Sequence, residues 1–208
     1  MKIEHILPQD IEARSMAIIE EELGEIQLPE DKKNIIKRVI HTTADFEFAR
    51  TMRFSDDAVE KGLAALKAGC TIITDTNMAL MGISQVSLTK LGCQKMCFMA
   101  DADVAKMANE NGTTRAVASM DKACTVKGPV IIAVGNAPTA LLRLDELIRA
   151  RKISPALVIG VPVGFVNVVY AKETIMQSGC PYIVATGRKG GSTIAAAICN
   201  ALLYSLTR

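Results

Sequence analysis

Tryptophan is absent from the 208-residue sequence, and aromatic residues make up only 4% of it. A core with so few rings has to be filled by alanine, valine, isoleucine, leucine and the ten methionines, which is more typical of helices packed on a sheet than of a β-barrel. No apolar run approaches the ~18 residues that a membrane-spanning helix requires, so a membrane partner is not predicted. The length suits one domain, and we expect residues 1–208 to form it.

The sequence also lacks a large excess of charge of one sign, and it lacks cysteines in a CxxC pair. The 24 basic and 22 acidic residues are scattered along the chain, so there is no basic stripe of the kind that binds nucleic acid. The six cysteines lie mostly within apolar runs, without a CxxC pair or a secretory signal, which is typical of reduced cysteines in a cytoplasmic protein. Cys93 and Cys97 have no further histidine or cysteine close in sequence to complete a ligand set, so no metal site is expected.

What the sequence does contain, from residue 70 onward, is an alternation of short β-branched runs with helical stretches. The expected strands are residues 70–74, 95–99, 130–134, 156–161 and 182–186, and the expected helices are residues 101–110, 115–126, 138–151, 166–178 and 192–205. Strands that are apolar on both faces and alternate with helices indicate a parallel sheet covered on both sides. The sequence therefore predicts an α/β fold, a three-layer α/β/α sandwich with a mainly parallel sheet of about five strands.

Three helices are expected before this alternation begins. The first covers residues 10–23, the second starts after Pro29, and the third runs to Lys67. The segment Ser55-Asp56-Asp57 is the expected N-terminal cap of the third helix. An N-terminal helical segment is therefore expected ahead of the sheet.

Polar residues and glycines that are suited to binding a ligand follow four of the five expected strands. Asp75 follows the first strand, Asn136 the third, Gly164 the fourth, and a glycine-rich turn over residues 187–192 the fifth. In open α/β sheets, ligands bind outside the carboxyl ends of the strands. Four such strand ends together predict a binding site at this edge of the sheet.

The glycine-rich turn GRKGGS, residues 187–192, combines three glycines with two cations ahead of an alanine-rich helix. Gly190 and Gly191 allow the backbone to approach a ligand closely, Ser192 can cap the helix, and the helix start favours an anion. The segment matches neither the Walker A motif nor the GxGxxG fingerprint. A phosphate site, a carboxylate site and a plain solvated turn all stay open.

Four further residues have more than one interpretation each. Asn136 is a ligand donor or simply part of a capped strand-to-helix turn, and Asp75 binds a ligand, orients another group or caps the next helix. Arg14 and Arg115 are solvated helix residues or clamps for a carboxylate. The residue types alone do not choose among these.

Histidine is scarce, and one of the two, His41, lies where an apolar helix face gives way to the segment HTTADFEF. It is either a buried imidazole bonded to a carbonyl or a proton donor, since imidazole suits proton transfer near neutrality. If the helix continues, Lys37 lies one turn before it and Asp45 one turn after it, and their charges act on its protonation in opposite directions. No nucleophile motif such as GxSxG is present, so acid/base chemistry is favoured over covalent catalysis.

Six segments carry a resemblance to a known family. They are RSMAII at 14–19, HTTADFEFA at 41–49, DTNM at 75–78, GNAPTALL at 135–142, PVGFV at 162–166 and GRKGGSTIAAAICNAL at 187–202. Together and in this order, they closely resemble the precorrin-8X methylmutases (precorrin isomerases) of cobalamin biosynthesis over essentially the whole chain. The TTADFEFA context is more similar to the enzymes of the anaerobic pathway, whose substrate is cobalt-precorrin-8.

The resemblance implies an isomerase that moves a methyl group from C-11 to C-12 of a large tetrapyrrole, giving cobyrinate or hydrogenobyrinate without a cofactor. It implies that His41 is the general acid and that the protein is a homodimer with active sites near the subunit interface. It also implies substrate contacts from Arg14, Ser15, Thr42, Thr43, Arg115, Asn136, Arg188, Gly190, Gly191 and Ser192. The alternatives are a nucleotide- or phosphate-binding enzyme that uses the turn over 187–192, and a tetrapyrrole carrier without catalysis.

Overall fold

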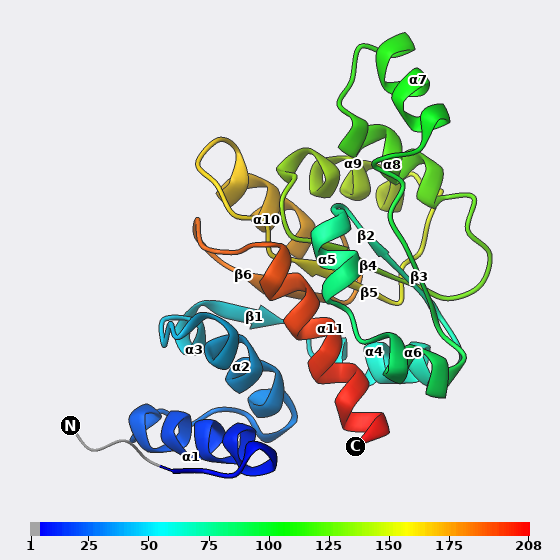
Figure 1. Cartoon of the computed structure of the whole chain (residues 1–208). Helices are drawn as coiled ribbons and strands as arrows, with labels where there is room; N and C mark the ends of the chain where they lie inside the picture. Colours follow the sequence, from blue (N-terminus) through cyan, green and yellow to red (C-terminus); the bar gives the residue numbers. More distant parts are fainter. Residues whose placement is uncertain (1–4) are drawn as a thin grey trace.

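A single sheet of six strands forms the centre of the computed structural model, which describes residues 5–208 (Figure 1). The strands are β1 (Met52–Phe54), β2 (Thr71–Thr74), β3 (Gln94–Met96), β4 (Val130–Val134), β5 (Leu157–Gly160) and β6 (Tyr182–Ala185). Their order is β1-β6-β5-β4-β2-β3, and each neighbouring pair is parallel except β1 and β6. The predicted α/β fold with a mainly parallel sheet is therefore confirmed, with one strand more than expected.

Alternating strand residues face two separate cores. In β4, Ile131 and Ala133 belong to one core and Ile132 and Val134 to the other, as the two-residue period of a strand requires. The first core is covered by α1 (Ile11–Leu23), α2 (Glu30–Thr43), α3 (Phe48–Thr51), α4 (Ala58–Lys67), α5 (Asn77–Gly82), α6 (Gln85–Leu91) and α11 (Ser192–Thr207). The second is covered by α7 (Ala102–Glu110), α8 (Arg115–Ala123), α9 (Pro138–Arg149) and α10 (Val168–Met176). The three-layer arrangement follows.

Helix α11 lies at the centre of the first layer, where it packs on β4 and β5 and is flanked by α2 on one side and by α5 on the other (Figure 1). It is apolar on most of its circumference, as expected for a helix that is buried on several sides. The close approach of α5 to α11 depends on Gly82, because a Cβ atom there would lie 2.9 Å from the Cβ atom of Ala196.

Four short elements were not predicted from the sequence. Strand β1 has three residues and forms the edge of the sheet, where it pairs antiparallel with β6, with Met52 opposite Ala185. Helices α3, α5 and α6 have four to seven residues each. Segments this short show too few residues for a period to be recognised, and the packing of the neighbouring elements decides their conformation. The strand expected at 95–99 is also shorter, since β3 covers Gln94–Met96.

The expected cap of helix α4 is only partly correct. Asp57 does occupy the N-cap position, but its side chain makes no capping hydrogen bond. Instead, the hydroxyl of Ser55 donates to Oδ1 of Asp57 at 3.0 Å, which holds the carboxylate away from the helix N–H groups. In the part of the chain that the structure describes, no helix has the length and apolar character needed to cross a membrane.

Candidate active site

Asp75 joins the ends of two neighbouring strands. It follows β2 and is almost fully buried, and its two carboxylate oxygens accept hydrogen bonds from the N–H groups of Gly135, Asn136 and Ala137 at 2.7–2.8 Å. Burial raises the pKa of this carboxyl, and the three N–H donors oppose the shift. Asp75 thus orients the segment that opens α9. The interpretation that it caps the next helix is wrong, because Thr76 accepts the capping bond of α5 from the N–H of Ala79 at 3.1 Å.

The glycines of the turn over residues 187–192 are required by the protein's own backbone. A Cβ atom at Gly190 would lie 2.2 Å from the carbonyl oxygen of Val161, and one at Gly135 would lie 2.6 Å from Cα of Ser192. The N–H of Gly191 donates to the carbonyl of Val161 at 2.8 Å. The turn therefore lies directly against the ends of β4 and β5. Its glycines are needed for this contact with the strands, whether or not a ligand is bound.

Ser192 does not cap helix α11, contrary to the sequence prediction. Gly191 occupies the N-cap position without a side-chain bond, and Ser192 is the first helical residue. From this position its hydroxyl oxygen lies 2.7 Å from that of Thr76. The hydroxyl pair joins the start of α11 to the start of α5, so it links two of the predicted strand ends.

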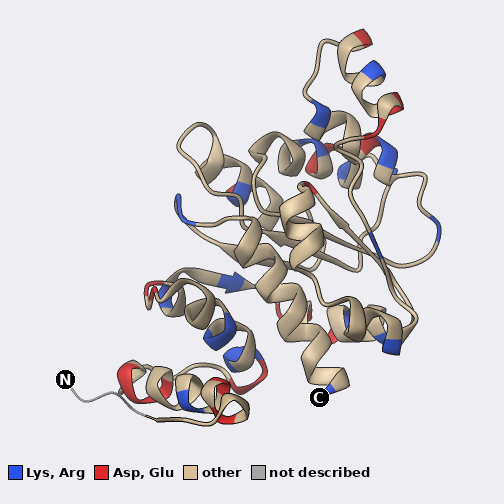
Figure 2. Cartoon of the chain, viewed as in Figure 1, with Lys and Arg blue, Asp and Glu red and all other residues tan. Residues whose placement is uncertain are grey.

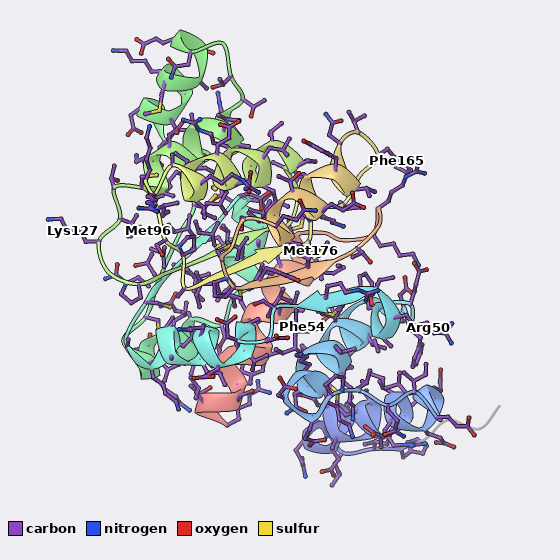
Figure 3. The ribbon with its side chains drawn as sticks, turned by 180° about the vertical axis from the view of Figure 1, so that it is seen from behind. Arg50, Phe54, Met96, Lys127, Phe165 and Met176 are labelled. Atoms are coloured by element: carbon purple, nitrogen blue, oxygen red, sulfur yellow. The ribbon has the colours of Figure 1, made fainter. Side chains whose placement is uncertain are left out.

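The two cations of the turn have different surroundings. Lys189 forms ion pairs with Asp45 at 2.5 Å and with Glu47 at 2.7 Å, which raises the pKa of Lys189 and lowers that of Asp45. The guanidinium of Arg188 lies 5.5 Å from the ring centroid of Phe165, and both side chains are exposed. Figure 2 shows the turn as a basic tip at the end of β6, and Figure 3 shows Phe165 beside it. Arg188 is therefore the cation that is open to an anionic ligand.

His41 is exposed in the last turn of α2, so the interpretation as a buried imidazole is wrong. The helix passes His41 and ends at Thr43, where Ala44 adopts a left-handed conformation with a φ of 53°. The two charges expected near the imidazole are engaged elsewhere, since Lys37 lies 2.6 Å from Glu20 and Asp45 pairs with Lys189. The imidazole is therefore exposed at the end of α2, and neither of these two charges is paired with it.

His41 lines a cavity of about 320 Å³ between α1 and α2. Ser15 from α1 lines the same cavity, together with the apolar residues Ile18 and Phe46 and the acidic residue Glu22. The hydroxyl of Ser15 donates to the carbonyl of Ile11 at 2.9 Å. The structure thus brings together two residues, Ser15 and His41, that were predicted as one site from segments 26 positions apart in the sequence.

Thr42 and Thr43 stabilise the end of α2. Their hydroxyls donate to the carbonyls of Arg38 and Val39 at 2.8 Å, and Oγ1 of Thr43 also accepts the N–H of Asp45 at 3.2 Å. These bonds hold the backbone that carries His41 but do not reach its ring. Direct support of the imidazole by the threonine hydroxyls stays a prediction.

A second and a third cavity continue the surface on the other side of α2. One, of about 290 Å³, is lined by Thr42 and by residues of α5 and α11 that include Met78 and Thr193. The other, of about 260 Å³, lies between α1, α2 and α11. Arg38 and Tyr204 line both cavities, with the guanidinium of Arg38 5.3 Å from the Tyr204 ring centroid. Sequence reasoning missed Arg38, although its position one helical turn before Thr42 was a usable signal.

Arg115 lies on the other side of the sheet from His41, near the start of α9, because the hydroxyl of Thr114 lies 3.3 Å from that of Thr139. It is exposed at the first position of α8, in the layer on the opposite face of the sheet from α2 (Figure 1). Another cavity, of about 430 Å³, lies in this layer between α8 and α9, and its cation Arg143 is paired with Asp121 and Glu146. Arg14 lies half-buried on α1 beside Ser15, and the side chain of Asn136 is exposed at the start of α9. One chain therefore does not bring Arg115 and His41 together.

The comparisons with known proteins agree with one another. A family model described as precorrin-8X methylmutase matches residues 10–205. The cobalt-precorrin-8 methylmutase of Salmonella typhimurium is 44% identical over 96% of this chain and 96% of its own length, and that of Leptospira interrogans is 42% identical over 95% and 93%. A solved structure of precorrin-8X methyl mutase from Thermus thermophilus superposes with a TM-score of 0.86 at 40% identity, covering 94% of this chain and 96% of that one. This chain therefore belongs to the precorrin-8X methylmutase family.

Proposed function

We propose that this chain catalyses the transfer of a methyl group from C-11 to C-12 within cobalt-precorrin-8, giving cobyrinate in cobalamin biosynthesis. The observation that carries this proposal is the match to the family over nearly the whole chain, with relatives named cobalt-precorrin-8 methylmutase. The site fits a rearrangement, which needs a held geometry and a placed proton donor rather than a nucleophile. No step of the proposal requires a resident cofactor.

We assign the proton donor to His41. Its ring lies at the mouth of the cavity shared with Ser15, and the α2 backbone that carries it is held by the Thr42 and Thr43 hydroxyls. A proton donated near ring C would compensate the charge that develops as the methyl group migrates.

We assign substrate binding to the surface around this donor. The substrate carries several carboxylates, and Arg188 with the backbone N–H of Gly190 offers positive charge and a hydrogen-bond donor at one edge of the sheet, beside Gly191 and Ser192. Exposed Met78 and Phe165 offer apolar contact for a flat macrocycle. The remaining predicted contacts are Arg14, Ser15, Thr42, Thr43, Arg115 and Asn136.

Incubation of the purified protein with its two candidate substrates tests the function. We expect cobalt-precorrin-8 to be converted to a corrin product, followed by its absorbance spectrum, at a higher kcat/KM than the cobalt-free precorrin-8X. Corrin binding without turnover would instead support the carrier, and an increase in Tm with nucleotides alone would support the nucleotide-dependent enzyme. Either result would overturn the methylmutase proposal.

We further propose that the protein is a homodimer in the cytoplasm. Arg115 and His41 lie in different layers of one chain, and a second copy can bring an arginine from one chain to the histidine of the other. Six free cysteines suit a reducing compartment. Light scattering after size-exclusion chromatography should give twice the 22.3 kDa of one chain. A mass of 22.3 kDa at working concentration would contradict the dimer.

A further inference from the structure

Lys172 is a buried lysine that the proposed mechanism does not use. It lies on α10, and its side chain is only 1% exposed. No carboxylate among residues 5–208 lies within ion-pair distance of its Nζ atom. Buried cations without an acidic partner are costly and need other compensation. Burial lowers the pKa of Lys172 to about 8, so the ammonium is still mostly charged at neutral pH.

The compensation comes from the glycine-rich turn. The Nζ atom donates to the carbonyl of Gly187 at 2.9 Å and to the carbonyl of Lys189 at 2.8 Å. The carbonyl between them, that of Arg188, accepts the N–H of Gly164 at 3.1 Å. Three successive carbonyls of the turn are therefore turned into the protein and bonded there.

This arrangement directs three successive N–H groups outward. The chain has no cis peptide bond among its described residues, and in a planar trans peptide the C=O and the following N–H point in opposite directions. The N–H groups of Arg188 and Gly190 consequently point away from the Lys172 ammonium, and the N–H of Lys189 points away from Gly164. Within residues 5–208 none of the three donates to a protein acceptor. A run of outward N–H groups in a turn is an anion-binding concavity.

We infer that Lys172 is a positioning residue, which holds two of the three inward carbonyls, those of Gly187 and Lys189, so that the N–H groups of residues 188–190 receive a carboxylate of the substrate. The inference rests on the proposed function, because that function identifies the tetrapyrrole as the molecule that carries the carboxylate. It adds Lys172 to that proposal as a residue that supports binding without touching the substrate. It also explains why the charge of Lys172 is buried. The backbone of the turn, with Arg188 beside it, is then the recognition element.

Replacement of the ammonium tests the inference. In Lys172→Met we expect KM for the tetrapyrrole to rise about tenfold or more, with kcat of the folded fraction within threefold of wild type. In Lys172→Gln the side chain is one atom shorter, so its amide does not reach the carbonyls of Gly187 and Lys189, and we expect the same rise in KM. This variant serves as the test if Lys172→Met does not fold. The matched control is Lys95→Met, which removes another partly buried lysine bonded to a carbonyl, that of Ile83 at 2.8 Å, and should leave KM unchanged.

A measurement without turnover separates this inference from the proposed function. Titration with tricarballylate, a small tricarboxylate, should shift the amide NMR signals of residues 188–190 in wild type and shift them much less in Lys172→Met. Unchanged KM together with wild-type shifts in a folded Lys172 variant would overturn the inference, as would an absence of shifts in wild type. A wild type that shows the shifts but turns over no tetrapyrrole would contradict the proposed function and leave the role of Lys172 supported.

Discussion

His41→Asn is expected to lower kcat by about 10²- to 10⁴-fold, the usual range for loss of a positioned general acid. Asparagine keeps a polar side chain of similar reach but cannot deliver a proton. His41 is exposed, and within residues 5–208 its ring makes no hydrogen bond that holds α2 together. The free energy of unfolding of the variant should therefore stay within about 0.5 kcal/mol of the wild-type value. Substrate binding should change little, so the loss should appear in kcat rather than in KM.

Steady-state kinetics with cobalt-precorrin-8, followed by absorbance, measures this effect. His5→Asn is the matched control, since His5 is the other histidine of the chain and is also exposed. A kcat of His41→Asn within tenfold of wild type would remove the imidazole from the proton transfer. The tetrapyrrole would then have to receive its proton from solvent or from another side chain of the site.

Asp75→Asn is expected to destabilise the folded protein by about 3 kcal/mol, even though it changes a single atom type. The two oxygens of Asp75 accept three backbone N–H groups from the segment before α9. The NH2 group of an asparagine is a donor, so it cannot accept the backbone N–H groups that it would face. Each buried donor left without an acceptor lowers the free energy of unfolding by about 1–3 kcal/mol. For a domain of this length, the loss corresponds to a fall in Tm of about 6–12 °C.

Thermal unfolding followed by circular dichroism measures the change. Asp56→Asn is the control, because Asp56 is an exposed aspartate on the loop before α4 and should change Tm by less than about 2 °C. A Tm of Asp75→Asn equal to that of wild type would show that the three hydrogen bonds do not hold the strand end. In that case Asn136 would have no fixed position from which to bind substrate.

The sequence predicted which segments lie together better than it predicted what single side chains do there. The carboxyl ends of β2, β4, β5 and β6 were predicted to lie together, and the structure joins them through Asp75, through the hydroxyl pair of Thr76 and Ser192, and through the bond from Gly191 to Val161. The predicted capping by Asp75 and Ser192 is wrong. A cap is predicted from neighbours three positions away, whereas both side chains bond to segments 60 or more positions away.

The missed residues share the same cause. Lys172 lies in the middle of a helix and, read in sequence, is one lysine among many solvated ones. Only the packing of α10 under the turn gives its ammonium two carbonyl acceptors. Likewise, Lys189 is one of two cations in a basic pair, and only the fold places the acidic loop with Asp45 and Glu47 next to it. The resemblance named Arg188 rather than Lys189 as a substrate contact, but the residue types of the pair did not show which cation is paired within the chain.

The sequence by itself determined the alternation of strands and helices, the mainly parallel sheet and the order of the family's segments, because hydrophobic periodicity and glycine positions act over a few neighbouring residues. The tertiary structure alone decided which polar groups are satisfied within the chain and which stay open to a ligand. Buried donors and acceptors find their partners across layers, so the pairing of Asp75, Lys172 and Lys189 depends on packing between distant segments. That pairing leaves His41, Arg188 and three backbone N–H groups exposed for chemistry.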